Sequence, residues 1–209
     1  MTGRFRLPSR LEALKLAPVS GVINMIARAI SDMHNESYET QRLIIRCCRV
    51  LDASLLSALM SPEISKWVAS WPFPLTPDQC EKILLANRAA AKEGKAFPGI
   101  VIEKHTGTII GWIKIAAEDN PGRSFELGYW IGENFQGNGY GFEAASGALD
   151  FAFSKLNATS VRAGAQLANA ASHELLRKLG MTEDGETDVW APSRKRFEKC
   201  KYWKLDRVE

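Results

Sequence analysis

The chain has 209 residues, of which 45% are hydrophobic and 24% are charged, and these fractions are typical of a globular domain with a core of its own. Charged residues interrupt every apolar run before it reaches the roughly 18 residues that a membrane span needs, so we predict no membrane segment. The net charge of +3 arises in the first 32 residues, and the remainder holds 22 basic and 22 acidic groups, which argues against a nucleic-acid-binding surface.

Cysteine and histidine usage favours a protein without a metal site. The cysteines form no CxxC pair, and the histidines stand apart from them along the chain, so we predict reduced thiols, a cytoplasmic protein and no zinc. The residues concerned are Cys47, Cys48, Cys80 and Cys200, with His34, His105 and His173.

The first part of the chain differs in composition from the rest, and we predict an N-terminal extension over residues 1–37 and one folded domain over residues 38–209. The extension is rich in arginine, and Pro8 and Pro18 break any long helix within it. Its apolar stretch is too short and too far from the start for a secretory signal peptide. Two interpretations stay open: an organellar transit peptide, or an upstream segment ahead of a true translation start at Met33.

In the first half of the domain, the pattern predicts one strand followed by a helical block. The β-branched and alternating stretch 40–49 is typical of a strand. A helix is expected over 51–60, with Asp52 as its cap. A second, short helix is expected over 63–74, where prolines end it. A third helix is expected from Thr76 as N-cap to Gly94.

The second half predicts three hairpin-linked strands and then two helices that alternate with strands. The strands are expected over 96–104, 108–116 and 124–132, with short turns between them. Helices 141–156 and 169–180 flank a strand at 160–166, and a loop over 187–198 leads to a last strand at 199–206.

The turn "QGNGYG", residues 136–141, lies between a strand and a helix. Glycine lets a ligand approach the main chain closely, and a helix N-terminus suits a phosphate group. A P-loop is excluded because no lysine follows, and a dinucleotide fingerprint is excluded by the spacing Gly137-x-Gly139-x-Gly141. The alternative is an ordinary loop before a helix.

The pattern Gln136-x-x-Gly139-x-Gly141 resembles the coenzyme A pyrophosphate turn of the GNAT superfamily of N-acetyltransferases. The stretches "ELGYWIGENFQGNGYGFEA" and "ANAASHELLRKLGM" are similar to the branch that contains the ribosomal-protein alanine N-acetyltransferases. "TQRLIIR" and "YWKL" resemble the first and last strands of that branch. The resemblance covers residues 38–205 and implies an α/β (α+β) GNAT fold, with a mixed, mainly antiparallel central sheet and helices on both faces.

The resemblance also implies acetyl-CoA as co-substrate, no metal, and an assignment of the cofactor-binding residues. Backbone N–H groups of the turn would hold the pyrophosphate, the strand before it would supply an oxyanion donor, and the next helix would contact the cofactor. The residues concerned are Gln136, Gly137, Asn138, Gly139, Tyr140 and Gly141 for the pyrophosphate, Trp130 or Ile131 for the oxyanion, and Asn169 and Ser172 on the helix. For Asn169, a role as helix cap is an equal alternative.

The resemblance also implies three candidate side chains for proton transfer. Ser172 would act as general acid near the thioester sulfur, although its hydroxyl could simply bond within its own helical turn. Glu126 would accept the amine proton through water, with an ordinary exposed strand residue as the alternative, and alternation places Gly128 and Trp130 on its face. Tyr202 is a weaker alternative acid, and Glu143 is expected to support the helix start.

The acceptor is expected to be a primary amine: a protein N-terminus, a metabolite or an antibiotic. Aromatic residues could line its pocket or belong to the core, and the basic segment 193–199, like Arg177 and Lys178, could bind a phosphate or lie in solvent. The aromatic residues are Trp67, Trp71, Phe73 and Trp190. We expect a monomer or homodimer without nucleic-acid or membrane partners; a non-catalytic CoA-binding sensor or scaffold is the alternative function.

Overall fold

The computed structural model describes residues 33–118 and 123–207, so the predictions made for residues 1–32 lie outside it. Within the described part, Met33 is fully buried in the core, and the first strand begins at Ser37. None of the helices found there has the length and hydropathy needed to cross a bilayer.

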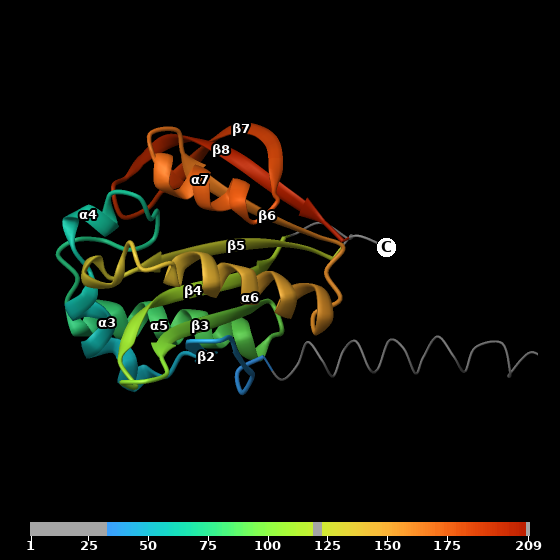
Figure 1. The fold of residues 1–209 in the computed structure, drawn as a ribbon. Helices are drawn as coiled ribbons and strands as arrows, with labels where there is room; N and C mark the ends of the chain where they lie inside the picture. The colour runs from blue at the N-terminus through green and yellow to red at the C-terminus, as the bar shows by residue number, and fades with distance from the viewer. Residues whose placement is uncertain (1–32, 119–122, 208–209) are drawn as a thin grey trace, which may run out of the picture.

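The described residues form one sheet of eight strands in the order β1-β2-β3-β4-β5-β6-β8-β7 (Figure 1). The strands are β1 Ser37–Glu39, β2 Leu43–Cys47, β3 Ala96–Glu103, β4 Ile109–Ala117, β5 Ser124–Ile131, β6 Ser160–Gln166, β7 Thr182–Ala191 and β8 Arg196–Asp206. Only the β5–β6 pair is parallel, and the other neighbouring pairs are antiparallel. The predicted mixed, mainly antiparallel sheet is confirmed.

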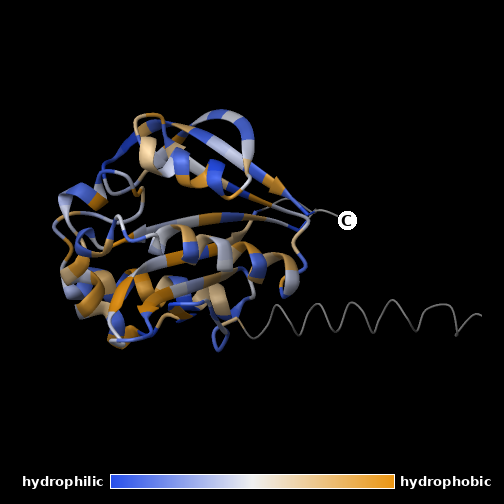
Figure 2. Cartoon of the chain, viewed as in Figure 1, coloured by the Kyte–Doolittle hydropathy of each residue, from blue (hydrophilic) through white to orange (hydrophobic). Residues whose placement is uncertain are grey.

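Helices cover both faces of this sheet, as predicted. On one face, α6 packs its alanines against β4 and β5, and on the other face α3 and α5 pack against β3 and β4 (Figure 1). The helices are α3 Ala53–Leu59, α4 Pro62–Ser65, α5 Pro77–Lys92, α6 Tyr140–Ser154 and α7 Ala170–Lys178, with short 3-10 turns at Val50–Asp52 and Glu133–Phe135. Hydrophobic residues concentrate on the central strands, whereas β7 is largely hydrophilic (Figure 2).

Local sequence signals determine where the long helix α5 begins. The Thr76 hydroxyl accepts a hydrogen bond from the Gln79 N–H, and the Gln79 side chain accepts one from the Thr76 N–H. This reciprocal pair satisfies two N–H groups that the first turn leaves without partners. Gly94, just past the helix, has a φ of +70°, which a glycine adopts without strain.

The predicted helix over 63–74 is wrong beyond its first turn, because α4 ends at Ser65. The backbone from that residue onward is held by a distant arginine and by one hydrogen bond within the segment. Arg194 donates to the carbonyl groups of Ser65 and Val68, and the Ser65 hydroxyl donates to the Trp71 carbonyl. These hydrogen bonds satisfy carbonyl groups that lack the partners of a continuing helix.

Two strands, β1 and β7, were missing from the prediction, which assigned 187–198 to a loop. β7 is mostly exposed, rich in Asp and Glu, and carries no hydrophobic alternation, so it lacks the usual strand signal. It forms because it pairs with β8 along the sheet edge, with a register irregularity near Gly185. Asp52 occupies the N-cap position of α3 as predicted, but its carboxylate makes no hydrogen bond to that helix. It accepts from the Arg49 N–H at the start of the preceding 3-10 turn and forms a bidentate ion pair with Arg46.

Candidate active site

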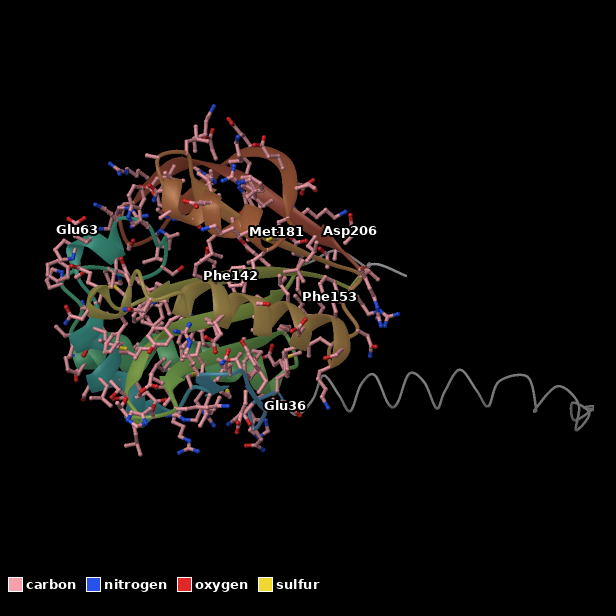
Figure 3. All side chains as sticks on the ribbon, in the orientation of Figure 1. Glu36, Glu63, Phe142, Phe153, Met181 and Asp206 are labelled. Atoms are coloured by element: carbon pink, nitrogen blue, oxygen red, sulfur yellow. The ribbon has the colours of Figure 1, made fainter. Side chains whose placement is uncertain are left out.

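The sheet divides between its two parallel strands. β5 and β6 are paired at only three positions, from Ser124 with Ser160 to Glu126 with Arg162, and then diverge (Figure 1). The split closes near Asp206 and opens toward Glu63 on α4, the two labelled ends of the molecule in Figure 3. A cleft of about 790 Å³ occupies the opening, lined by β4, β5, β6, α7 and residues 63–71.

This cleft collects nearly all of the residues that the sequence proposed for the site. Of the twelve candidates, only Asn138 is not part of the lining. Its carbonyl accepts a hydrogen bond from Arg42, and its side-chain amide donates to the carbonyl groups of Phe135 and Gln136. Asn138 therefore shapes the turn from outside the cleft.

Strand alternation places the candidate catalytic side chains on two sides of the split. Glu126, Gly128 and Trp130 project from the β5 face that α3 and α5 cover, whereas Tyr129 projects toward α6. Tyr129 meets Ser172 from α7, and Glu126 meets Tyr202 from β8. The cleft thus has one pair of polar side chains on each side of the sheet.

The 136–141 turn presents a series of backbone donors at the start of α6. Gly137 and Gly139 have φ angles of +77° and +78°, the left-handed conformation that glycine adopts most easily. Within the described residues, none of the N–H groups from Gly137 to Phe142 has a hydrogen-bond acceptor, since the first helical bond runs from Glu143 to Gly139. Unpaired N–H groups at a helix N-terminus form an anion site, so the turn fits a pyrophosphate.

A brace from the segment between β1 and β2 holds this turn, and its residues Thr40 and Arg42 are not among those predicted for the site. Glu143 accepts hydrogen bonds from the Thr40 hydroxyl, the Arg42 N–H and the Arg42 side chain, each at 2.6 Å. The Arg42 guanidinium also lies 4.5 Å from the ring centre of Tyr140. Glu143 supports the helix start as expected, and the Thr-x-Arg-Leu sequence "TQRL" supplies its partners.

The brace makes the stability of the fold depend on pH. Burial raises the pKa of Glu143, but hydrogen bonds from Thr40 and Arg42 outweigh burial and leave the pKa below its ordinary value. The brace therefore stabilises the fold above about pH 4.3, and this contribution is lost as the pH falls through the lower folded-state pKa.

We expect Glu143→Gln to lower the melting temperature at neutral pH and to flatten its fall between about pH 5 and pH 3, because the variant has no carboxylate to protonate. Thermal unfolding over a pH series measures this. Glu81→Gln, an exposed change on α5, should keep the wild-type profile. A Glu143→Gln profile parallel to the wild type would contradict the role assigned to the brace.

The antiparallel register determines which β5 backbone groups face the split. The Glu118 N–H donates to the Ser124 carbonyl, and the Gly132 N–H donates to the Ile110 carbonyl. In an antiparallel pair every second residue is hydrogen-bonded to the neighbouring strand, so Glu126, Gly128 and Trp130 are the β5 residues between these ends that bond to β4. The Ile131 N–H therefore points away from β4 and into the split. The Gln136 side chain donates to the Ile131 carbonyl, which fixes this end of the strand.

On the α6 side, Asn169 caps α7 by accepting a hydrogen bond from the Ser172 N–H at 3.2 Å. The Ser172 hydroxyl lies 3.1 Å from the Tyr129 hydroxyl, so it is directed across the cleft instead of back to its own helix. Burial raises the pKa of Tyr129 to about 12, with the Ser172 contact opposing the rise, so the phenol remains a proton donor at neutral pH.

On the other side, the Tyr202 hydroxyl donates to Glu126 at 3.2 Å. Burial and then the charge of Glu126 raise the pKa of Tyr202 to about 12, so Tyr202 stays protonated. The Arg162 guanidinium lies 4.6 Å from the Tyr202 ring centre. The ring occupies space that a side chain at Gly164 would need, because a β-carbon there would come 2.8 Å from it.

The candidate aromatic residues separate into two sets. Trp71 packs edge-on against Trp112 and Trp130 with ring centres 5.1 and 5.2 Å away, and these three rings line the cleft together with Trp67. Trp71 thus belongs to both the core and the cleft. Phe73 and Trp190 are about half exposed, at 51% and 49%, and lie outside the lining.

Two arginines of the basic segment 193–199 hold parts of the fold together. Arg194 and Arg196 both bind Glu198, whose side chain is only 9% exposed. Arg194 also donates to Ser65 and Val68 and so ties the β7–β8 turn to the segment beside the cleft mouth.

We expect Arg194→Lys to destabilise the protein by about 1–2 kcal/mol, because lysine keeps the charge but cannot reach the carboxylate and both carbonyl groups at once. Arg196→Lys, at the exposed partner of the same carboxylate, should cost less than about 0.5 kcal/mol. Urea unfolding of both variants measures the difference. Equal losses of unfolding free energy in the two variants would show that Arg194 does not stabilise the segment beside the cleft opening.

A family model described as the acetyltransferase (GNAT) domain matches residues 42–182, which is more than half of the chain and includes the split, the 136–141 turn and α7. The chain belongs to the GNAT acetyltransferase family. It is accordingly an acyltransferase that uses acetyl-CoA.

Similar proteins agree with the family. The uncharacterized N-acetyltransferase p20 of Bacillus licheniformis is 30% identical over 72% of this chain and 84% of its own. The structure of Mycobacterium smegmatis RimJ in complex with CoA-disulfide superposes with a TM-score of 0.74 at 18% identity, covering 83% of this chain and 88% of its own. The ribosomal-protein-S5-alanine acetyltransferase from Vibrio fischeri has a TM-score of 0.71 at 21% identity, and the match covers 82% of this chain and 97% of the Vibrio fischeri chain.

The possible metal ligands among the described residues are not arranged as a metal ion needs. No group of three or more His, Cys, Asp or Glu side chains gathers there as a metal site would require. The four cysteines are buried and unpaired.

Proposed function

We propose that the protein acetylates the amine of a protein N-terminus or a small molecule by direct attack inside the β5/β6 split. The observation that carries this proposal is the convergence, on one cleft, of the unpaired N–H groups after Gly137, the split-facing N–H of Ile131 and the Glu126 carboxylate. Direct attack needs an aligned amine, stabilisation of negative charge on the carbonyl oxygen, and paths for two protons.

The residues of the turn and of β5 bind and orient the co-substrate. The N–H groups from Gly137 to Phe142 hold the pyrophosphate, and the Arg42–Glu143 brace keeps them in place. Acetyl-CoA, when bound, supplies an activated thioester carbonyl. The Ile131 N–H stabilises the negative charge that develops on the carbonyl oxygen, because it has no strand partner on that side.

The two polar pairs then divide the proton transfers between them. Glu126 removes the amine proton through water while Tyr202 holds the carboxylate in position. On the cofactor side, Ser172 supplies a proton to the departing thiolate, and Tyr129 bonds the Ser172 hydroxyl and fixes its direction. Trp130 lines the acceptor side with its ring, next to Trp71.

A protein N-terminus is the acceptor that the similar proteins favour, since one of them is named for alanine acetylation on a ribosomal protein. We propose a cytoplasmic enzyme, which the four unpaired thiols fit. Neither a nucleic acid nor a membrane is needed for this reaction.

The rival function is a CoA-binding sensor or scaffold without turnover. Free CoA release, measured across amines and N-terminal peptides, distinguishes the two, with calorimetric titration of acetyl-CoA as the binding control. For at least one class of acceptor, we expect CoA to be released faster than in the absence of acceptor. Tight acetyl-CoA binding with no release across the panel would favour the sensor, and absence of binding would overturn both.

A further inference from the structure

Lys114 is a charged residue on β4 that the proposed mechanism does not use. It lines the cleft, is half-buried, and lies directly opposite Gly128 in the β4–β5 register. Within the described residues its ammonium group has no hydrogen bond or ion pair at contact distance. Burial lowers the pKa of Lys114, and the charge of Glu126 opposes that shift.

The other charges that line the cleft are matched. Glu63 pairs with Lys66, Glu174 pairs with Lys178, and Glu198 is held by two arginines. Of the charged lining residues that the structure describes, Lys114 and Glu126 are the two without an ion-pair partner. A half-buried charge without a partner costs free energy that a bound ligand of opposite charge can recover.

The two unpaired charges are placed to act on one ligand. Alternation and register put Lys114 and Glu126 on the same face of neighbouring strands in a diagonal relation, in which two residues are typically about 7–8 Å apart and their β-carbons somewhat closer. Gly128 lies between them and has no atoms within 4 Å of the place where a β-carbon would be. A small ligand can therefore lie against the β5 backbone, between a cation and an anion.

We propose that Lys114 binds a carboxylate of the acceptor, so that the preferred acceptor is an amine with a carboxylate a few bonds from its nitrogen. The amine lies toward Glu126 and the carboxylate toward Lys114. This inference rests on the proposed function and specifies its substrate class. Two kinds of molecule carry this chemistry, a free amino acid and a peptide N-terminus with an acidic side chain.

Steady-state kinetics with two matched acceptor pairs tests the inference. Alanine against alaninamide represents the free amino acid, and a peptide beginning Ala-Glu against one beginning Ala-Gln represents the acidic N-terminus. For one pair, the wild type should prefer the carboxylate member by about 10-fold or more in kcat/KM, mainly through KM. Lys114→Met should abolish that preference and change the amide member less than about 3-fold, because it removes only the carboxylate contact.

Lys82→Met, an exposed lysine on α5 that lies outside the cleft, is the matched control and should keep the wild-type preference. The pair that shows the preference identifies the source of the carboxylate. Equal or better reaction of the amide members in both pairs, or a preference that survives in Lys114→Met, overturns the proposal.

A binding experiment tests the same carboxylate contact without turnover. The acetylated products of the two carboxylate acceptors are titrated calorimetrically into the protein with CoA present. At least one should bind about 10-fold more weakly to Lys114→Met than to the wild type and to Lys82→Met. Equal affinities, or no binding to the wild type, overturn the carboxylate site. Because this experiment needs no reaction, its failure is distinct from an absence of CoA release, which concerns the proposed function.

Discussion

Glu126→Gln is expected to lower kcat/KM for the acceptor by at least about 100-fold, the usual contribution of a positioned general base. Glutamine has nearly the same size as glutamate, and its amide oxygen can still accept the hydrogen bond from Tyr202. The variant therefore keeps the geometry of the cleft but cannot accept a proton. Initial rates of CoA release at saturating acetyl-CoA measure the loss.

Two controls separate the base from its surroundings. Tyr202→Phe should lower kcat/KM for the acceptor by less than about 10-fold, because this change removes only the hydroxyl that positions the Glu126 carboxylate. Calorimetric affinity of Glu126→Gln for acetyl-CoA should match the wild type, because Glu126 lies on the acceptor side of the sheet. Full activity of Glu126→Gln at neutral pH would remove Glu126 from the mechanism and leave positioning as the main source of rate.

Gly139→Val is expected to weaken acetyl-CoA binding by at least about 30-fold, or about 2 kcal/mol. Gly139 has a φ of +78°, and a β-branched residue strongly avoids that conformation. A β-carbon there would also approach an Arg42 nitrogen to 3.4 Å. Valine should therefore turn the peptide planes that direct the N–H groups into the cleft, and calorimetric titration measures the result.

Gly107→Val is the matched control for backbone strain. Gly107 lies in the β3–β4 turn with a φ of +70°, and nothing lies within 4 Å of its β-carbon position. Both variants should have a lower melting temperature than the wild type, but only Gly139→Val should bind acetyl-CoA more weakly. An affinity for acetyl-CoA that is unchanged in Gly139→Val would count against the turn as the pyrophosphate site.

The parts of the fold that the sequence predicts correctly are those determined by local signals. α5 follows from Thr76 and the following Pro77, and β6 follows from the alternating stretch 160–166, which has the predicted bounds. The 136–141 turn is recognisable because glycine is needed at its positive φ angles. Each of these features depends on residues that are close together in the chain.

The parts that it misses depend on distant residues. β7 has no hydrophobic pattern and exists because β8 pairs with it. α4 ends at Ser65, where Arg194, more than 120 residues away, binds the carbonyl groups of Ser65 and Val68. No local pattern shows that Arg42 and Glu143 meet across 101 residues.

The site divides in the same way. The family resemblance makes Glu126, Ser172 and Tyr202 candidates, but their placement on opposite sides of the sheet follows only from the register. No sequence signal marks Lys114, because lysine at an alternating strand position normally faces solvent. Its half-buried position beside the Glu126 carboxylate is visible only after folding.

The divergence of β5 and β6 also bears on how the protein avoids self-association. An unpaired strand edge can recruit a strand from another molecule, which is a common route to aggregation. Here the unpaired length of β5 from Leu127 to Ile131 lines a cleft that β6 and α7 enclose from the other side. An intruding strand would have to enter that confined space, whereas a slender ligand can do so. The interruption of the sheet thus supplies free backbone donors for binding without offering an open template for polymerisation.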